Sequence, residues 1–125
     1  MNQKDKILKT IQIENYVWIL YLILIGLSFY ANYEEEKYFK YDDLEAKEKY
    51  RCLNIIIFSI ALLVYLYFFY DNYKNVMERD INTSCSKAFY DDLNLLASTL
   101  ILIAGAIFLY IAISDINLET EIAFN

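Results

Sequence analysis

The sequence predicts an all-α integral membrane protein with three antiparallel transmembrane helices. They form an up-down-up hairpin whose helices extend beyond the bilayer. Three runs, 15–33, 52–70 and 93–114, contain no charged residue. At about 1.5 Å per residue, each run is long enough as a helix to cross a hydrocarbon core of roughly 30 Å. The chain has no proline and only two glycines, so little in it interrupts a helix.

A chain of 125 residues is expected to form a single membrane domain, 1–125. Hydrophobic residues make up 58% of the chain, and they are segregated from the charges rather than mixed at a helical or strand period. A soluble helical bundle is the alternative, but helices that are apolar on every face would not be solvated. The net charge of −6 argues against a nucleic-acid partner, which requires a basic surface.

The boundaries of the helices follow from local signals. Ile7, Leu8 and Ile11 recur at helical spacing, so the first helix is expected to begin near Asp5, and it is expected to end at residues 36–38. Tyrosine and tryptophan side chains gather near the ends of the runs, as is typical of residues at the lipid headgroups.

The second helix is expected to begin at Asp42, because Glu45 follows three residues later as in a capping box, and to continue over 43–79. Residues 81–83 predict a turn, and Thr83, Ser84 or Ser86 is expected to cap the third helix. Both connections are short, so successive helices should be antiparallel neighbours.

Small residues repeat every seven positions along one side of the third helix. They are Ser98, Gly105 and Ala112, and the large residues Ile101 and Phe108 flank them on the same side. In lipid, small side chains allow two helix backbones to approach closely. Two alternatives remain open for this stripe: it packs against the other helices of the same chain, or it forms a subunit interface around a symmetry axis.

Three further positions in the spans are candidates for helix contacts. Gly26 is an isolated small residue on the first helix, and Asn54 and Asn94 are the strongest polar groups. The two asparagines lie near the starts of successive antiparallel helices, so they should lie at opposite membrane faces and not pair within one subunit. Each is expected to bind water, a backbone carbonyl group or another chain.

The sequence offers no candidate for catalysis. No Asp, Glu, Lys, Arg or His lies within the three runs, whereas proton-coupled transport and voltage sensing usually rely on such residues. The chain has no histidine, no phosphate-binding loop and no metal-binding motif. We therefore predict that the chain has no catalytic, cofactor-binding or metal-binding residue and that the protein is not an enzyme.

Two functional hypotheses remain. The first is a small oligomeric membrane protein that acts as an interaction, accessory or immunity-type component, with lipid, copies of itself and an unknown protein as partners. The alternative is a holin-like or channel-like pore, with walls lined by residues such as Asn94, Ser98 and Thr99.

Composition and charge bear on where the protein resides. Its many Ile, Asn, Lys and Tyr residues are typical of an AT-rich bacterial or phage genome, so a bacterial plasma membrane is expected. A cytoplasmic N-terminus would place six Lys and Arg residues inside and five outside, which slightly favours that orientation.

Overall fold

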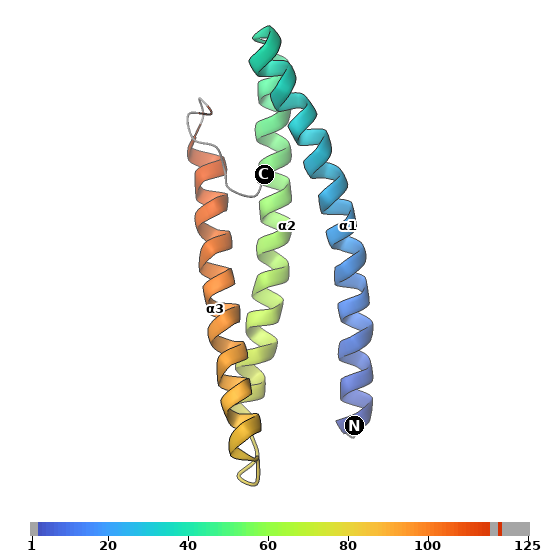
Figure 1. The fold of residues 1–125 in the computed structure, drawn as a ribbon, viewed down its shortest axis with the longest axis vertical. Helices are drawn as coiled ribbons and strands as arrows, with labels where there is room; N and C mark the ends of the chain where they lie inside the picture. Colours follow the sequence, from blue (N-terminus) through green and yellow to red (C-terminus); the bar gives the residue numbers. More distant parts are fainter. Residues whose placement is uncertain (1–2, 116–117, 119–125) are drawn as a thin grey trace. The chain divides into compact units, whose positions relative to one another are not determined.

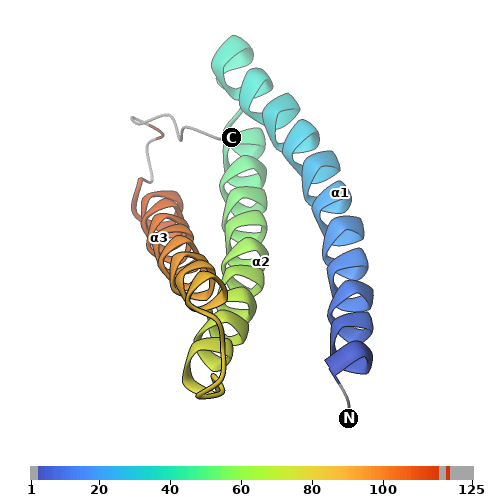
Figure 2. The same ribbon diagram turned by 60° about the horizontal axis from the view of Figure 1, so that its bottom comes forward.

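The computed structural model describes residues 3–115 and residue 118. Over these residues the chain forms three α-helices and no strand: α1 (Gln3–Tyr41), α2 (Leu44–Met77) and α3 (Cys85–Ser114). Figures 1 and 2 show each helix as one unbroken coil. All three are long and apolar enough to cross a membrane. The predicted fold class, an all-α membrane protein with three spans, is confirmed.

The chain divides into two compact units, residues 1–53 and residues 54–125, and α2 passes from the first into the second. The first unit contains α1 and the beginning of α2. The second contains the rest of α2 and all of α3. The organisation as a single domain, 1–125, stays a prediction.

In the first unit, α1 is longer than its apolar run. Its 39 residues correspond to about 58 Å at 1.5 Å per residue. The helix ends at Tyr41 rather than at residues 36–38. Ion pairs one turn apart support this extra length, because Lys40 Nζ lies 2.6 Å from Glu36 Oε1 and Lys37 Nζ lies 3.7 Å from Glu34 Oε2.

Two aspartates connect α1 to α2. Asp42 has a φ of 51°, in the left-handed region that commonly terminates a helix and that Asp tolerates better than most residues. Asp43 then caps α2, because its Oδ1 accepts hydrogen bonds from the backbone N–H groups of Glu45 (3.1 Å) and Ala46 (3.2 Å). The prediction that Asp42 caps this helix was wrong by one residue, since position 42 is used to end α1.

In the second unit, a short turn reverses the chain between α2 and α3 (Figure 1). The backbone N–H of Thr83 donates to the carbonyl of Asp80 at 3.1 Å, which closes the turn. Ser84 caps α3, and its side chain accepts a hydrogen bond from the N–H of Lys87 at 3.2 Å. The predicted choice of Thr83, Ser84 or Ser86 thus resolves to Ser84. Helix α3 ends at Ser114, where the third apolar run ends.

The helices bury little of their own surface. In the most apolar window of each helix, only 6% (α1), 22% (α2) and 11% (α3) of the residues are buried. A soluble protein with so small a core would not fold, but lipid tails solvate apolar side chains as well as a protein interior does. Contacts that hold the helices together must therefore come from close packing and from polar groups.

Candidate functional site

The small-residue stripe is the packing face of the α2–α3 hairpin. Ser98, Gly105 and Ala112 are the buried residues of α3. A Cβ atom at Gly105 would lie 2.8 Å from Cδ2 and 3.1 Å from Cε2 of Tyr65 on α2. The first distance is shorter than real contacts of a Cβ atom and the second is tighter than most of them, so glycine allows α2 to approach here. The contacts match the first alternative for the stripe, packing within the same chain.

The neighbours of the stripe have different surroundings. The Phe108 ring packs on the Phe58 ring of α2 with centroids 5.8 Å apart, and Phe58 and Ala112 form one buried cluster. Ile101 is 49% exposed. A Cβ at Gly26 of α1 would meet no atom within 4 Å. A subunit interface at these positions stays a prediction.

A polar cluster links the two helices at one end of the stripe. The side-chain amide of Asn72 on α2 donates a hydrogen bond to Ser98 Oγ, and it also lies 3.4 Å from the carbonyl oxygen of Asn94. Ser98 Oγ donates to the same carbonyl oxygen at 2.8 Å. In this cluster Asn94 contributes its backbone, while its side chain is exposed. Asn54, the other predicted polar group, is buried.

Asn72 was not among the predicted residues, because it lies just beyond the apolar run 52–70. A heptad register between the antiparallel helices α2 and α3 identifies it. Tyr65 lies opposite Gly105, and antiparallel helices that keep a seven-residue repeat then pair residue 58 with 112 and residue 72 with 98. All three pairs are present in the structure.

Beyond this register, an ion pair joins the turn to α3. Arg79 Nη2 donates to Asp92 Oδ1 at 2.7 Å and to the carbonyl of Ala88 at 3.2 Å. The Asp92 side chain is 58% exposed, so solvent weakens this pair and its contribution to stability is small. Lys87 and Asp91 form a second ion pair at 3.0 Å, in which the lysine side chain is exposed and the aspartate side chain is mostly covered. Both ion pairs lie at or beside the turn, and we infer that they help to fix its conformation.

The second candidate region is the charged helical hairpin formed by residues 34–51, here termed the polar head. It carries ion pairs between residues one turn apart on both helices. Four side chains in and beside it are buried, and at helical spacing they define one face on each helix: Ala31 and Glu34 on α1, Ala46 and Tyr50 on α2. Lys47 Nζ of α2 lies 5.4 Å from the centroid of the Tyr38 ring on α1. The head is therefore a packed unit.

Three large apolar side chains are exposed at the end of the polar head. Phe39 is 61% exposed, Tyr41 74% and Leu44 69%, and these residues are here termed the tip. Helix α1 continues for eight residues between Tyr33, where its uncharged run ends, and Tyr41. That distance is about 12 Å along the helix axis, which carries the tip out of the hydrocarbon core and into or past the headgroups.

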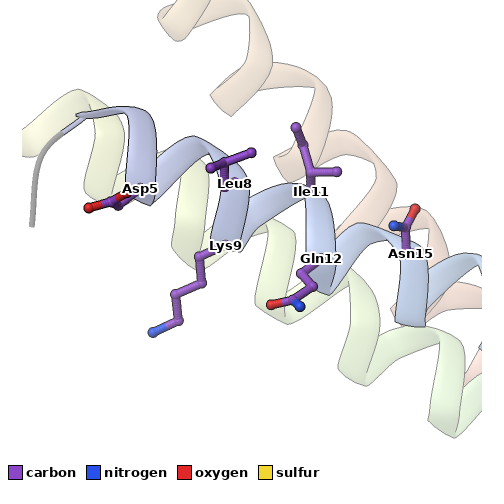
Figure 3. Close-up of a pocket in the computed structure, with 6 residues that line it drawn as sticks. All are labelled: Asp5, Leu8, Lys9, Ile11, Gln12 and Asn15. Atoms are coloured by element: carbon purple, nitrogen blue, oxygen red, sulfur yellow. The ribbon is translucent and has the colours of Figure 1, made fainter.

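A groove on the surface of α1 does not resemble a ligand site. It has a volume of about 390 Å³ and is lined by Asp5, Leu8, Lys9, Ile11, Gln12 and Asn15, all on α1 (Figure 3). A ligand pocket is enclosed by several elements, whereas this groove has side chains of one helix only. Within residues 3–115 and 118, no group of three or more His, Cys, Asp or Glu residues is placed to hold a metal ion.

Comparison with known proteins adds no functional assignment, since no protein-family model, curated protein or solved structure matches the chain. The described residues show a small three-span membrane protein with a polar contact between α2 and α3 and an ordered polar head.

Proposed function

We propose that this protein is a non-catalytic component of a bacterial plasma membrane that acts by binding another membrane protein, as an accessory or immunity-type subunit does. The observation that supports the proposal most directly is the polar head. It is packed, charged and exposed, and it ends in the apolar tip of Phe39, Tyr41 and Leu44.

A tip of this kind suits protein recognition. Aromatic side chains bring a large contact area with few rotatable bonds, and they are enriched at the centres of protein interfaces. The charged residues around the tip form ion pairs within their own helices. They keep the head compatible with water, and they need no partner protein to neutralise them. Binding would then bury the apolar tip and leave a polar rim.

The absence of an ionisable residue in the three runs supports a role without catalysis or ion-coupled transport. We accordingly propose no cofactor and no nucleic-acid partner. The count of Lys and Arg residues favours a cytoplasmic N-terminus, which would place the polar head on the outer side of the membrane.

The hydrogen bonds of the second unit weigh against the alternative, a pore lined by Asn94, Ser98 and Thr99. Ser98 is bonded to Asn72. The hydroxyl of Thr99 donates to the carbonyl of Leu95 at 2.8 Å. Hydroxyl groups that already take part in hydrogen bonds within the protein are less suited to coordinate water along a pore wall.

A photo-crosslinking amino acid at position 41 tests the proposal in membranes of the source cell. We expect one discrete crosslinked protein, and we expect Phe39→Ala with Leu44→Ala to abolish it. The matched control carries the same probe at position 81, because Ile81 is also apolar and is 97% exposed, but lies in the α2–α3 turn. Equal products at both positions, or none at position 41, would contradict the proposal.

Membrane permeability separates the two hypotheses, the accessory subunit and the pore. Purified protein in proteoliposomes should not release a small fluorescent dye if the protein is an accessory subunit. Dye release at low protein-to-lipid ratio would support the pore.

A further inference from the structure

Helix α3 carries a second heptad pattern on the side opposite its contact with α2. Large apolar residues recur at alternating spacings of three and four: Leu93, Leu96, Leu100, Ile103, Ile107 and Tyr110. All six are exposed, at 43% to 70% of their surface. In a coiled coil these are the a and d positions, and Ser98, Gly105 and Ala112 then occupy the f positions on the far side.

The residues beside this row are small in the middle of the helix. Ala97 and Ala104 occupy the e positions, and Thr99 and Ala106 the g positions. Large residues at a and d supply the knobs of knobs-into-holes packing, and small residues beside them allow two helix backbones to approach closely in lipid. A face that only contacts lipid has no such requirement, because acyl chains adapt to any apolar surface.

The size of this row is sufficient for pairing. Half of a large apolar side chain is roughly 100 Å², so six of them cover on the order of 600 Å². Stable interfaces between proteins start at about 600 Å² per partner, and in lipid such an area stabilises a dimer through close side-chain packing rather than through removal from water. Copies of one chain inserted in the same orientation present parallel α3 helices, so each a or d residue would meet its own counterpart across a two-fold axis.

We propose that this row, the α3 seam, binds the α3 seam of a second copy of the chain, as a parallel zipper within the membrane. The proposal goes beyond the partner-binding role, because it names a second contact, between two copies of the chain, and the surface that makes it. It places the subunit contact on the face of α3 that α2 leaves free, and it leaves the polar head of each copy available for another protein.

Disulfide crosslinking tests the seam in the full-length protein. The background is Cys52→Ser with Cys85→Ser, since both native cysteines are free and exposed. Leu100→Cys and Ile103→Cys place single thiols at an a and a d position, where Cα atoms of paired helices come within the roughly 7 Å that a disulfide allows. Ile101→Cys is the matched control, because Ile101 is 49% exposed at the same depth but lies off the seam.

We expect oxidation in liposomes to produce disulfide-linked dimers several-fold faster at positions 100 and 103 than at position 101. Equal rates at all three positions would indicate random collision and would overturn the proposal. So would faster dimer formation at position 101, which would put the subunit contact beside the stripe, or no dimer at any position. Photo-crosslinking from position 41 does not depend on the seam, so failure of the seam and failure of the partner-binding role give different results.

Discussion

Gly105→Ala should destabilise the α2–α3 hairpin although alanine is the better helix former. The new Cβ would lie 2.8 Å from Cδ2 of Tyr65 and 3.1 Å from Cε2. Both atoms belong to a ring that cannot bend away at one end, so the helices must separate or the tyrosine must leave its rotamer. Overpacking of this kind costs about 1–3 kcal/mol.

A matched control isolates that contact. In Gly26→Ala the new methyl group meets nothing within 4 Å, and both glycines lie inside long helices. The preference of a helix for alanine over glycine, about 1 kcal/mol, therefore applies to both variants and cancels in their difference. We expect Gly105→Ala to be less stable than Gly26→Ala by about 1–3 kcal/mol.

Reversible unfolding of the detergent-solubilised protein by sodium dodecyl sulfate, followed by the distance between dyes on α2 and α3, measures the difference. Tyr65→Ala supplies a second test, because it removes the ring that the new methyl group meets. In that background Gly105→Ala should lose most of its penalty, with a coupling energy of about 1–2 kcal/mol. Equal stability of Gly105→Ala and Gly26→Ala, or strict additivity with Tyr65→Ala, would refute the packing argument.

Three further results are expected. Asn72→Ala should destabilise the hairpin by about 0.6–2 kcal/mol in the same assay, and it should show no additional loss when combined with Ser98→Ala, because the two side chains bond to each other. Asp43→Ala should cost about 0.5–2 kcal/mol, read as reduced helix content and earlier unfolding, because the cap of α2 is lost. Single cysteines at Lys49 and Lys87 should react with an impermeant reagent from opposite sides of the membrane, and reaction from one side would contradict the order of the spans.

The fold was predictable because each spanning helix is specified by the composition of its own uncharged run, without contacts to other segments. A run of 19 or more uncharged residues specifies a spanning helix without any knowledge of its neighbours. The residues at which the helices begin and end were less predictable. Asp42 and Asp43 are chemically identical, and which of them caps α2 depends on where α1 stops. Helix α1 stops late because charged residues beyond the apolar run continue the helix through pairs such as Glu36 and Lys40.

The contacts were only partly predictable. The stripe on α3 is visible in the sequence because seven-residue spacing repeats three times, but its partner on α2 consists of Phe58, Tyr65 and Asn72, which share no chemical type. The polar head was expected as a charged extension, but the burial of Glu34 within a helix pair depends on the angle at which two helices leave a turn. That angle is a property of the turn geometry rather than of any single residue pattern.

The pairing of Asn72 with Ser98 explains how α2 and α3 keep one register in lipid. Apolar side chains gain little from one neighbour over another there, because acyl chains would solvate them equally well. If the helices slipped by one heptad so that Asn72 faced Gly105, Asn72 would lose Ser98, Tyr65 would face Ala112, and Phe58 would lie opposite a position beyond the end of α3. The side-chain amide of Asn72 would then lose its hydrogen bond to Ser98 Oγ, and the net contribution of such a bond to stability is about 0.5–1.5 kcal/mol. A single polar pair at the end of the stripe thus selects the register, and Gly105 against Tyr65 sets how closely the two helices approach.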